Sequence, residues 1–430
     1  MLYMNIDNAV GRYVGYGKET ELLERDTALK DTNFISAIVG PRRAGKSSIM
    51  ILYMQKLYDN GENPVFINGE DIDFAGITAD SLDDVESAIH RIYDLGKKGK
   101  AYLFIDEVQS LPEWSRWLRT LFDEGTYRIF VSGSTSELTK EKLPSELRGR
   151  ALEIMVLPFS YREYCNAKGV AYSKYPKPAD AGALAGALED FLEYGGYPEV
   201  VKTEDAQLKR VILSDLYNTV IRHDLIEKYK IRKVSEFKAF TNAMFGSACR
   251  HLSVPNLVRW FKDNGIMISS QTASNYVNYA ASVFMVYLLY PYSRKLKERN
   301  TKPKLYALDS GILGLFEKDM GKKLENTILV ELVRRRKEVY YYDADAADVD
   351  FVVIEEGRVA EVIQVSYSID NAETYLRETA SLANASKKLK CENALILTFN
   401  EEKTLTSGGV RIRVVPAWKW LLEEEKPSRY

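Results

Sequence analysis

A run of eight residues near the N-terminus has the composition and spacing of a phosphate-binding loop. The run Gly40-Pro41-Arg42-Arg43-Ala44-Gly45-Lys46-Ser47 fits the pattern G-x-x-x-x-G-K-[ST]. Glycines let the backbone close around a phosphate with its N–H groups turned inward. The lysine reaches the β- and γ-phosphates, and the serine hydroxyl can bind Mg²⁺. The loop therefore predicts binding of ATP together with magnesium.

Two adjacent carboxylates, Asp106 and Glu107, follow the apolar run Tyr102–Ile105. At the end of such a strand, Asp106 can hold the hydrated magnesium of a bound nucleotide. Glu107 can orient a water and take its proton as the water attacks the γ-phosphate. Side chains of adjacent strand residues face opposite ways, so the pair serves one site only if the strand ends there. The alternative is a solvated acidic strand end.

Further polar residues follow the next strand pattern. Ser132 and Ser134 come at its end, where polar side chains of an open parallel sheet face the ligand crevice. Arg150, and after it Arg148, is a candidate for stabilising the negative charge of the transition state. Turn-forming serines and a surface ion pair are the alternatives.

These observations define one predicted site. The predicted nucleotide-binding residues are Gly40, Pro41, Arg42, Arg43, Ala44, Gly45, Lys46, Ser47, Ser48 and Ser134. The predicted catalytic residues are Lys46, Asp106, Glu107 and Arg150, and the predicted magnesium ligands are Ser47 and Asp106.

Short apolar runs that alternate with helical patterns must position these residues. The expected strands are 34–39, 64–68, 101–105, 128–132 and 151–156. Helical patterns lie between most of them, as at 48–58 and 113–122. Strands that alternate with helices predict a mainly parallel sheet covered on both faces, an α/β fold.

The pattern changes after Pro158. Residues 172–181 are rich in proline and small residues and predict an exposed connection. Residues 184–282 are mostly helical in pattern, and strand patterns return from residue 284, which predicts a C-terminal α+β domain.

Two short helices, 253–262 and 270–281, are predicted on either side of a turn, as in a helix-turn-helix. The stretch 294–304 holds six basic residues and one acid. Duplex DNA is therefore a candidate partner. The alternative is a protein-packing unit beside a solvated loop. The polar residues expected on the exposed face of the second helix are Gln271, Ser274, Asn275 and Asn278.

The overall composition is that of an ordinary globular protein. The 430 residues include 59 Lys and Arg and 61 Asp and Glu, so the net charge of −2 gives no global attraction to nucleic acid or membranes. The three cysteines are widely spaced, which suggests buried thiols in a reducing compartment. No signal peptide or membrane-spanning stretch is evident, so we expect a cytoplasmic protein without membrane association.

The order of the motifs resembles prokaryotic AAA-type P-loop ATPases that carry a C-terminal domain of unknown function 4143. The motifs in order are GPRRAGKSS (40–48), FIDEVQ (104–109), VSGSTSEL (131–138), LRGR (147–150) and VLPFSYREY (156–164). Later stretches that resemble this family are YGGYP (194–198), RHD (222–224) and KLYALDSG (304–311). The resemblance implies an AAA-like domain with an extra strand between the P-loop strand and the strand that ends in Asp106 and Glu107. It also implies a winged-helix middle and a C-terminal fold like that of PD-(D/E)xK restriction endonucleases.

The nuclease-like fold lacks part of its expected active site. Glu325 and Asp350 fall where that fold keeps its acids, but Gln364 replaces the second carboxylate and Ser366 replaces the lysine. An amide and a hydroxyl make a poor divalent-metal site. We therefore expect this domain to be catalytically inactive and to serve in recognition or packing.

The sequence thus predicts an ATP-hydrolysing, magnesium-dependent molecular switch that couples its nucleotide state to a DNA or protein partner. The alternative is a nucleotide-dependent DNA-binding or regulatory protein with little turnover. The expected domains are an AAA-like domain (1–170), a helical and winged-helix region (171–300) and a nuclease-like domain (301–430).

Overall fold

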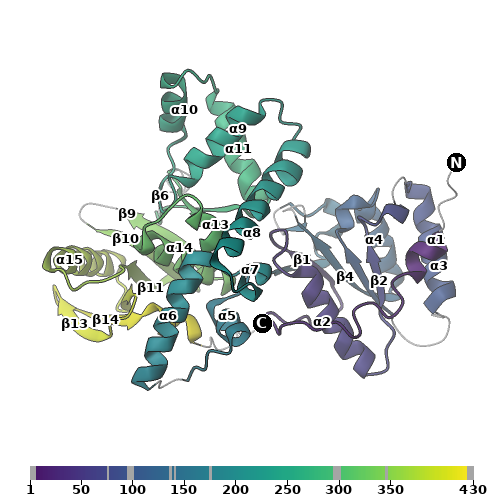
Figure 1. The fold of residues 1–430 in the computed structure, drawn as a ribbon, viewed down its shortest axis with the longest axis horizontal. Helices are drawn as coiled ribbons and strands as arrows, with labels where there is room; N and C mark the ends of the chain where they lie inside the picture. The colour runs from purple at the N-terminus through teal and green to yellow at the C-terminus, as the bar shows by residue number, and fades with distance from the viewer. Residues whose placement is uncertain are drawn as a thin grey trace. The chain divides into compact units, whose positions relative to one another are not determined.

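The computed structural model describes residues 6–74, 77–93, 101–134, 138–139, 142–173, 177–293, 302–343 and 347–423. The chain divides into two compact units, residues 1–157 and 158–430. In Figure 1 the first unit runs from purple to blue and the second from teal to yellow. The predicted domain limits at residues 170 and 300 stay predictions.

The first unit is built on a five-stranded, fully parallel sheet in the order β2-β3-β4-β1-β5. The strands are β1 (Ile35–Val39), β2 (Val65–Asn68), β3 (Ala101–Asp106), β4 (Tyr127–Gly133) and β5 (Ala151–Met155). The α-helices are α1 (Ile6–Gly11), α2 (Lys46–Asp59), α3 (Leu82–Tyr93) and α4 (Trp114–Glu124). Short 3-10 helices are η1 (Ile72–Phe74), η2 (Ala79–Ser81), η3 (Val108–Ser110) and η5 (Ser145–Leu147).

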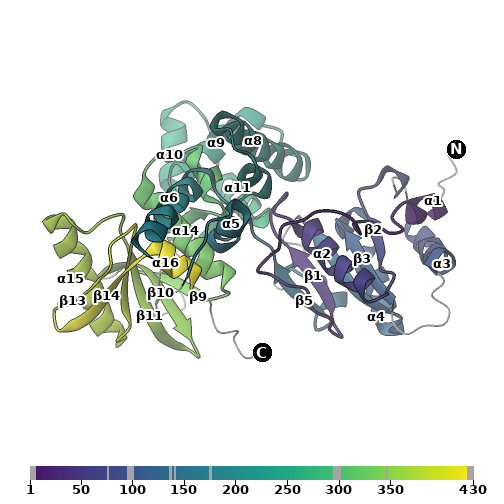
Figure 2. The same ribbon diagram turned by 60° about the horizontal axis from the view of Figure 1, so that its bottom comes forward.

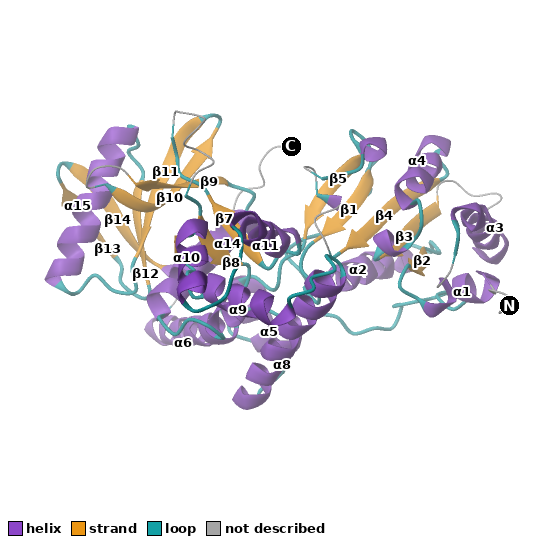
Figure 3. Ribbon diagram, turned by 90° about the horizontal axis from the view of Figure 1, so that it is seen from above, coloured by secondary structure: helices purple, strands orange, loops and turns teal. Residues whose placement is uncertain are grey.

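The helices lie on both faces of this sheet. Figure 3 shows α2 on one face and α4 on the other. Every residue of β1 is buried, as expected for a central strand covered on both sides. Met50 and Met54 of α2 pack with Phe104 and Phe130 of the sheet in one apolar cluster. Because β2, β3, β4 and β1 are parallel neighbours, the loops after β1, β3 and β4 open at one edge of the sheet.

The predicted parallel sheet is therefore confirmed. The predicted order is confirmed as well, since β4 lies between the P-loop strand β1 and the Asp106 strand β3. The five predicted strands match β1 to β5 to within one or two residues at either end.

The second unit begins with helices. They are α5 (Tyr161–Lys168), α6 (Pro178–Tyr194), α7 (Pro198–Lys202), α8 (Ala206–Thr219), α9 (Val234–Phe245), α10 (Val254–Asp263) and α11 (Ser270–Ser282). A π-helix, η6 (Val220–Glu227), continues α8. Helices α9 to α11 share an apolar core that includes Phe240, Phe261 and Val277. A turn joins α10 to α11, as predicted.

A three-stranded antiparallel sheet combines one strand before the two helices α10 and α11 with two strands after them. It consists of β6 (Arg250–His251), β7 (Val286–Leu289) and β8 (Lys304–Ala307) in the order β6-β8-β7. The short helix α13 (Ser310–Gly314) comes next. Most of the predicted basic stretch, residues 294–301, lies outside the described residues.

The C-terminal part is a six-stranded mixed sheet flanked by helices (Figure 2). Its order is β13-β14-β12-β11-β10-β9. The strands are β9 (Glu338–Asp343), β10 (Asp348–Glu355), β11 (Arg358–Val365), β12 (Ala394–Thr398), β13 (Lys403–Ser407) and β14 (Val410–Pro416). The helices are α14 (Met320–Arg334), α15 (Ala372–Leu389) and α16 (Ala417–Leu422). This confirms a C-terminal domain that contains both helices and strands.

Candidate nucleotide-binding site

Two glycines shape the loop between β1 and α2. Gly40 has φ 151°, and a Cβ on it would lie 1.9 Å from the carbonyl oxygen of Val156. Gly45 has φ 100° and stands at the N-cap of α2. A Cβ on Gly45 would lie 2.6 Å from Nη1 of Arg25. Both positions therefore require glycine for backbone conformation and for close packing.

Lys46 is buried, with only 5% of its surface exposed, and its amino group points into the loop. Nζ donates to the carbonyl oxygens of Gly40 at 3.2 Å and Pro41 at 3.1 Å. It also lies 3.9 Å from Oε1 of Glu107. The lysine is thus held where it can meet phosphate oxygens that the loop surrounds.

Asp106, the last residue of β3, is joined by hydrogen bonds to two serines. The Ser47 hydroxyl donates to Oδ2 of Asp106 at 2.5 Å, and the Ser132 hydroxyl donates to Oδ1. Ser47 comes from the first turn of α2 and Ser132 from β4, so three elements meet at this carboxylate. Carboxylate and hydroxyl oxygens are the ligands that Mg²⁺ prefers, and Ser47 and Asp106 fit such an ion.

Glu107 has the left-handed conformation, with φ 48° and ψ 51°. This conformation ends the alternation of the strand and brings the Glu107 carboxylate to Lys46, although Asp106 precedes it directly. Gln109 Nε2 donates to Oε2 of Glu107 at 2.5 Å, and the Ser134 backbone N–H donates to the same oxygen at 3.2 Å. The predicted base is therefore fixed from three directions.

The remaining loop residues occupy the same edge of the sheet. Arg42 lies with Nη2 3.8 Å from Oε1 of Glu70, and Arg43 has φ 60°. Ser48 lies in the first turn of α2. Ser134 is 3% exposed and contributes its amide to Glu107.

Arg150 is not brought to this site in its own chain. Its carbonyl accepts from the N–H of Ile35, the first residue of β1, whereas the loop follows Val39 at the other end. Four residues of strand separate the two ends by about 13 Å. The Arg150 guanidinium instead pairs with Asp123, its Nε 3.3 Å from Oδ1. Arg150 precedes β5 and therefore lies at the end of β1 opposite the phosphate loop, so a role for it at a nucleotide stays a prediction.

Two residues at the site escape sequence reasoning. Gln109 holds Glu107, and Arg25 donates from Nη1 to the carbonyl of Ala44 at 2.9 Å. Gln109 follows the carboxylate pair by two residues, a spacing that could have drawn attention to it. Arg25 precedes the loop by 15 residues in an irregular segment, so only the folded structure places it there.

A cluster of ionisable residues lies in the second unit. Tyr306 donates to Oε1 of Glu325 at 2.6 Å, and Lys304 Nζ lies 3.8 Å from Oδ1 of Asp350. Burial raises the pKa of Glu325 to about 8 and that of Asp350 to about 6. Gln364 Nε2 donates to Oε2 of Glu378 at 2.7 Å. Among the described residues, no three His, Cys, Asp or Glu side chains are grouped to hold a metal ion.

The position of Lys304 differs from the prediction that it belongs to an exposed basic surface. It is 6% exposed, and its amino group faces Asp350 and Asp348. A buried and paired ammonium is not available to a phosphate backbone, so Lys304 does not belong to that surface.

Ser366, which stands where the nuclease-like fold would keep its lysine, donates to the carbonyl of Ser368 at 2.9 Å.

Two of the sequence motifs pack against each other through Asp309. Its carboxylate accepts from the N–H groups of Gly196 at 2.8 Å, Gly311 at 2.8 Å and Ile312 at 3.1 Å. A Cβ on Gly195 would lie 2.2 Å from Oδ1 of Asp309. Burial raises the pKa of Asp309 to about 6. The GGYP and K-x-Y-x-x-D-x-G stretches therefore form one structural joint.

The comparisons with known proteins agree with this architecture. Residues 32–165 match the family described as "AAA domain", and residues 320–420 match domain of unknown function DUF4143. An uncharacterised protein of Methanocaldococcus jannaschii, MJ1544, is 30% identical over 419 residues, which covers 94% of this chain and 92% of that protein. The chain belongs to the same family. An uncharacterised protein of Haemophilus influenzae is 25% identical over 409 residues, which covers 93% of this chain and 97% of that protein.

The predicted AAA domain and C-terminal DUF4143 domain are thereby confirmed. Residues 185–321 match a further domain of unknown function, DUF8612, and the YGGYP, RHD and KLYALDSG stretches lie inside it. The Walker-type ATPase PABY2304 of Pyrococcus abyssi is similar with a TM-score of 0.45 and 14% identity over 66% of this AAA-domain protein and 90% of that chain. In the described parts of the chain, no helix is both long and apolar enough to span a bilayer.

Proposed function

We propose that this AAA-domain protein is a magnesium-dependent ATPase that acts as a molecular switch. The observation that supports this most is the convergence of Lys46, Ser47, Asp106 and Glu107 at one edge of a parallel sheet. These residues come from the end of one strand, β3, and the start of one helix, α2. Their chemistry suits a nucleotide triphosphate, a divalent cation and an attacking water.

Each residue has a distinct role in the proposed reaction. The loop amides and Lys46 bind the β- and γ-phosphates and offset the charge that develops during transfer. Ser47 and Asp106 would hold magnesium, which supplies charge neutralisation and orients the phosphates when bound. Glu107 accepts a proton from the water that attacks the γ-phosphorus. Products are ADP and inorganic phosphate.

Hydrolysis would then change how the second unit engages a protein or DNA partner. The large C-terminal unit, which the nucleotide site does not require for its own geometry, is the part that a partner would meet. We keep Arg150 only as a residue that a neighbouring copy could present to the nucleotide, since its own chain holds it at the opposite edge of the sheet.

Equilibrium binding of a fluorescent ATP analogue tests the nucleotide site. The wild type should bind in the presence of Mg²⁺, and Lys46→Ala should lose most of this affinity because the charged partner of the phosphates is gone. Lys56→Ala, on the same helix but in its last turn, is the matched control and should bind as the wild type does. Equal binding by Lys46→Ala would contradict the assignment.

A second candidate is a nucleotide-dependent DNA-binding protein with little turnover. It is favoured by α11, which presents Gln271 and Asn278 on its exposed side after a turn from α10. A salt-sensitive shift of duplex DNA, lost when Lys295, Lys297 and Arg299 are changed to alanine, would support it. Absence of any shift at low salt would remove this candidate.

A further inference from the structure

Arg25 connects the phosphate loop to the end of the first unit. Its Nη1 donates to the Ala44 carbonyl at 2.9 Å, and its Nη2 donates to the Leu157 carbonyl at 2.7 Å. Leu157 is the last residue of this unit. The planar guanidinium can bind two carbonyls at once, whereas the single ammonium of lysine has no such fixed fork.

The contact with Ala44 acts on the loop that surrounds the phosphates. The Ala44 carbonyl and the Gly45 N–H belong to one peptide unit, whose N–H is among those that a loop of this type turns toward phosphate. A positive charge on the carbonyl side aligns and polarises that peptide dipole, with its positive end toward the phosphate. Gly45 makes room for this, because a Cβ there would lie 2.6 Å from Nη1 of Arg25.

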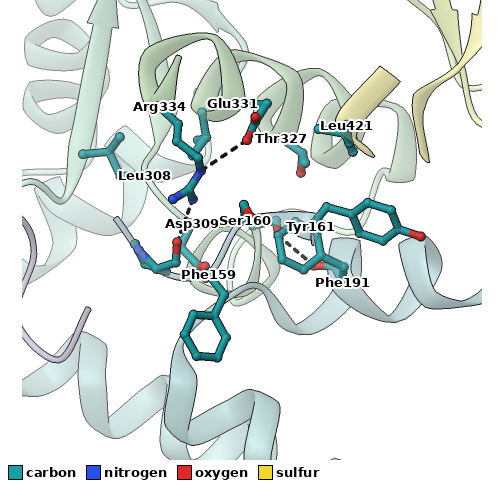
Figure 4. A pocket seen from close by; sticks show the side chains of 13 residues that line it. Phe159, Ser160, Tyr161, Phe191, Leu308, Asp309, Thr327, Glu331, Arg334 and Leu421 are labelled. Atoms are coloured by element: carbon teal, nitrogen blue, oxygen red, sulfur yellow. Dashed lines mark hydrogen bonds and ion pairs between the residues drawn. The ribbon is translucent and has the colours of Figure 1, made fainter. Parts of the chain in front are cut away.

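The contact with Leu157 acts on the connection to the second unit. A second arginine holds the next residue along the chain, since Nη2 of Arg334 donates to the Pro158 carbonyl at 2.6 Å. Nε of Arg334 lies 3.2 Å from Oε2 of Glu331, and Figure 4 shows both side chains at a pocket that Pro158 also lines. Two successive carbonyls, one in each unit, are therefore each fixed by an arginine.

The loop also touches the same segment without Arg25. Gly40 packs against the carbonyl of Val156, and the Val156 N–H donates to Val39 at 2.7 Å. The residues just before the connection thus form part of the wall of the phosphate loop. Residues 156 and 157 therefore contact the loop directly, through Gly40 and through Arg25.

We propose that Arg25 is a positioning residue that holds the phosphate loop ready for ATP and couples it to the Leu157–Pro158 connection. This inference rests on the proposed nucleotide binding. It implies reciprocity, because a connection that stabilises one arrangement of the loop changes ATP affinity by the same factor as ATP changes the connection. Arg25 does not touch the reacting atoms and acts through the backbone of Ala44.

The test combines ATP affinity with hydrogen exchange. In the Glu107→Gln background, which prevents turnover, the analogue's affinity and the exchange of amides 156–164 are measured with and without MgATP. ATP should slow exchange in this segment. Arg25→Ala should weaken affinity about tenfold, the loss expected for one charge-assisted hydrogen bond, and abolish the ATP-dependent change in exchange. Arg25→Lys, which keeps the charge and one contact, should recover part of both effects.

Arg128→Ala is the control, because Arg128 pairs with Asp31 and Asn33 in the same unit, away from the loop. It should leave affinity and the ATP-dependent exchange unchanged. If Arg25→Ala fails to fold, Arg25→Lys is measured in its place. The proposal is overturned if Arg25→Lys has the affinity and the exchange response of the wild type. If the wild type binds ATP and Arg25→Ala has the same affinity and the same exchange response, this inference alone is wrong. A wild type that does not bind ATP would remove the proposed function as well.

Discussion

Glu107 adopts a backbone conformation that is uncommon for residues other than glycine, with φ 48°. Such a conformation persists where the surroundings fix it, and here Lys46, Gln109 and the Ser134 amide all engage the carboxylate. The 3-10 turn 108–110 that follows places Gln109 back against Glu107. The backbone conformation and the carboxylate contacts together fix the proposed base.

Gln109→Ala should lower kcat for ATP roughly tenfold to a hundredfold, because the carboxylate loses the donor that sets its orientation. KM for ATP should change little, since the side chain of Gln109 donates to Glu107 and acts on the orientation of the proposed base. Steady-state kinetics of both proteins measure this, with thermal melting as the check on folding. A rise in KM at constant kcat would mean that Gln109 serves binding instead of orientation.

The sequence predicts most of the residues that the structure gathers at the loop. Lys46, Ser47, Asp106 and Glu107 follow a spacing that chemistry alone can interpret. Arg25 and the position of Arg150 do not follow from spacing. They depend on where an irregular segment folds back and on which end of β5 carries the arginine, and both are set by tertiary packing.

At the scale of elements, apolar runs identify the buried strands well, whereas helices and strands in polar or proline-containing segments are missed. Pro178 was expected in an exposed connection, yet it is the first residue of α6, where its fixed φ suits a helix start. The edge strand β13, KTLTS, is mostly exposed, so its sequence shows no apolar alternation. It is a strand because it pairs antiparallel with β14. Neither the start of α6 nor β13 could be distinguished from a loop by composition.

Removal of the contacts made by Asp309 should lower the free energy of unfolding. Asp309→Asn replaces an acceptor-only carboxylate, which binds three N–H groups, with an amide that can leave the Gly196 N–H unpaired. The expected loss in free energy of unfolding is about 1–3 kcal/mol. Urea denaturation measures it.

Asp319→Asn is the matched control, since Asp319 is also an N-cap, for α14, but is exposed. Asparagine caps helices nearly as well as aspartate, so this variant should lose no more than a few tenths of a kcal/mol. Equal losses for the two variants would show that Asp309 is an ordinary cap and not a joint between two motifs.

At the scale of the whole molecule, the second unit should show a pH dependence that comes from Glu325. Burial raises the pKa of Glu325 from 4.5 to about 8, so the folded chain binds this proton more tightly than the unfolded chain. Between these values the folded state holds more protons, and the free energy of unfolding therefore falls as pH rises. The contribution is fully present below about pH 4.5 and is lost as pH passes 8.

Glu325→Gln removes this titration. Urea midpoints of the transition that reports on the second unit, measured at pH 5.5 and 8.5, should fall more for the wild type than for the variant. Tyr306→Phe, which removes only the hydroxyl that donates to Glu325, should leave the pH dependence in place. Identical pH dependence in wild type and Glu325→Gln would show that Glu325 is not the residue responsible.

The two units contain different groups of residues. The first contains the residues proposed to bind and hydrolyse ATP, and the second carries the joint of Asp309 and the ionisable cluster around Glu325. The relatives that match nearly the whole chain are themselves uncharacterised, so the proposed switch rests on the chemistry of the site.

The most direct test is steady-state release of phosphate from MgATP by the wild type and by Glu107→Gln, with binding of the ATP analogue measured in parallel. We predict that the wild type turns over, whereas Glu107→Gln binds ATP but hydrolyses it at least a hundredfold more slowly, about the effect of losing a general base. Equal turnover by both proteins would contradict the role of Glu107, and a wild type that neither binds nor hydrolyses ATP would contradict the proposed function itself.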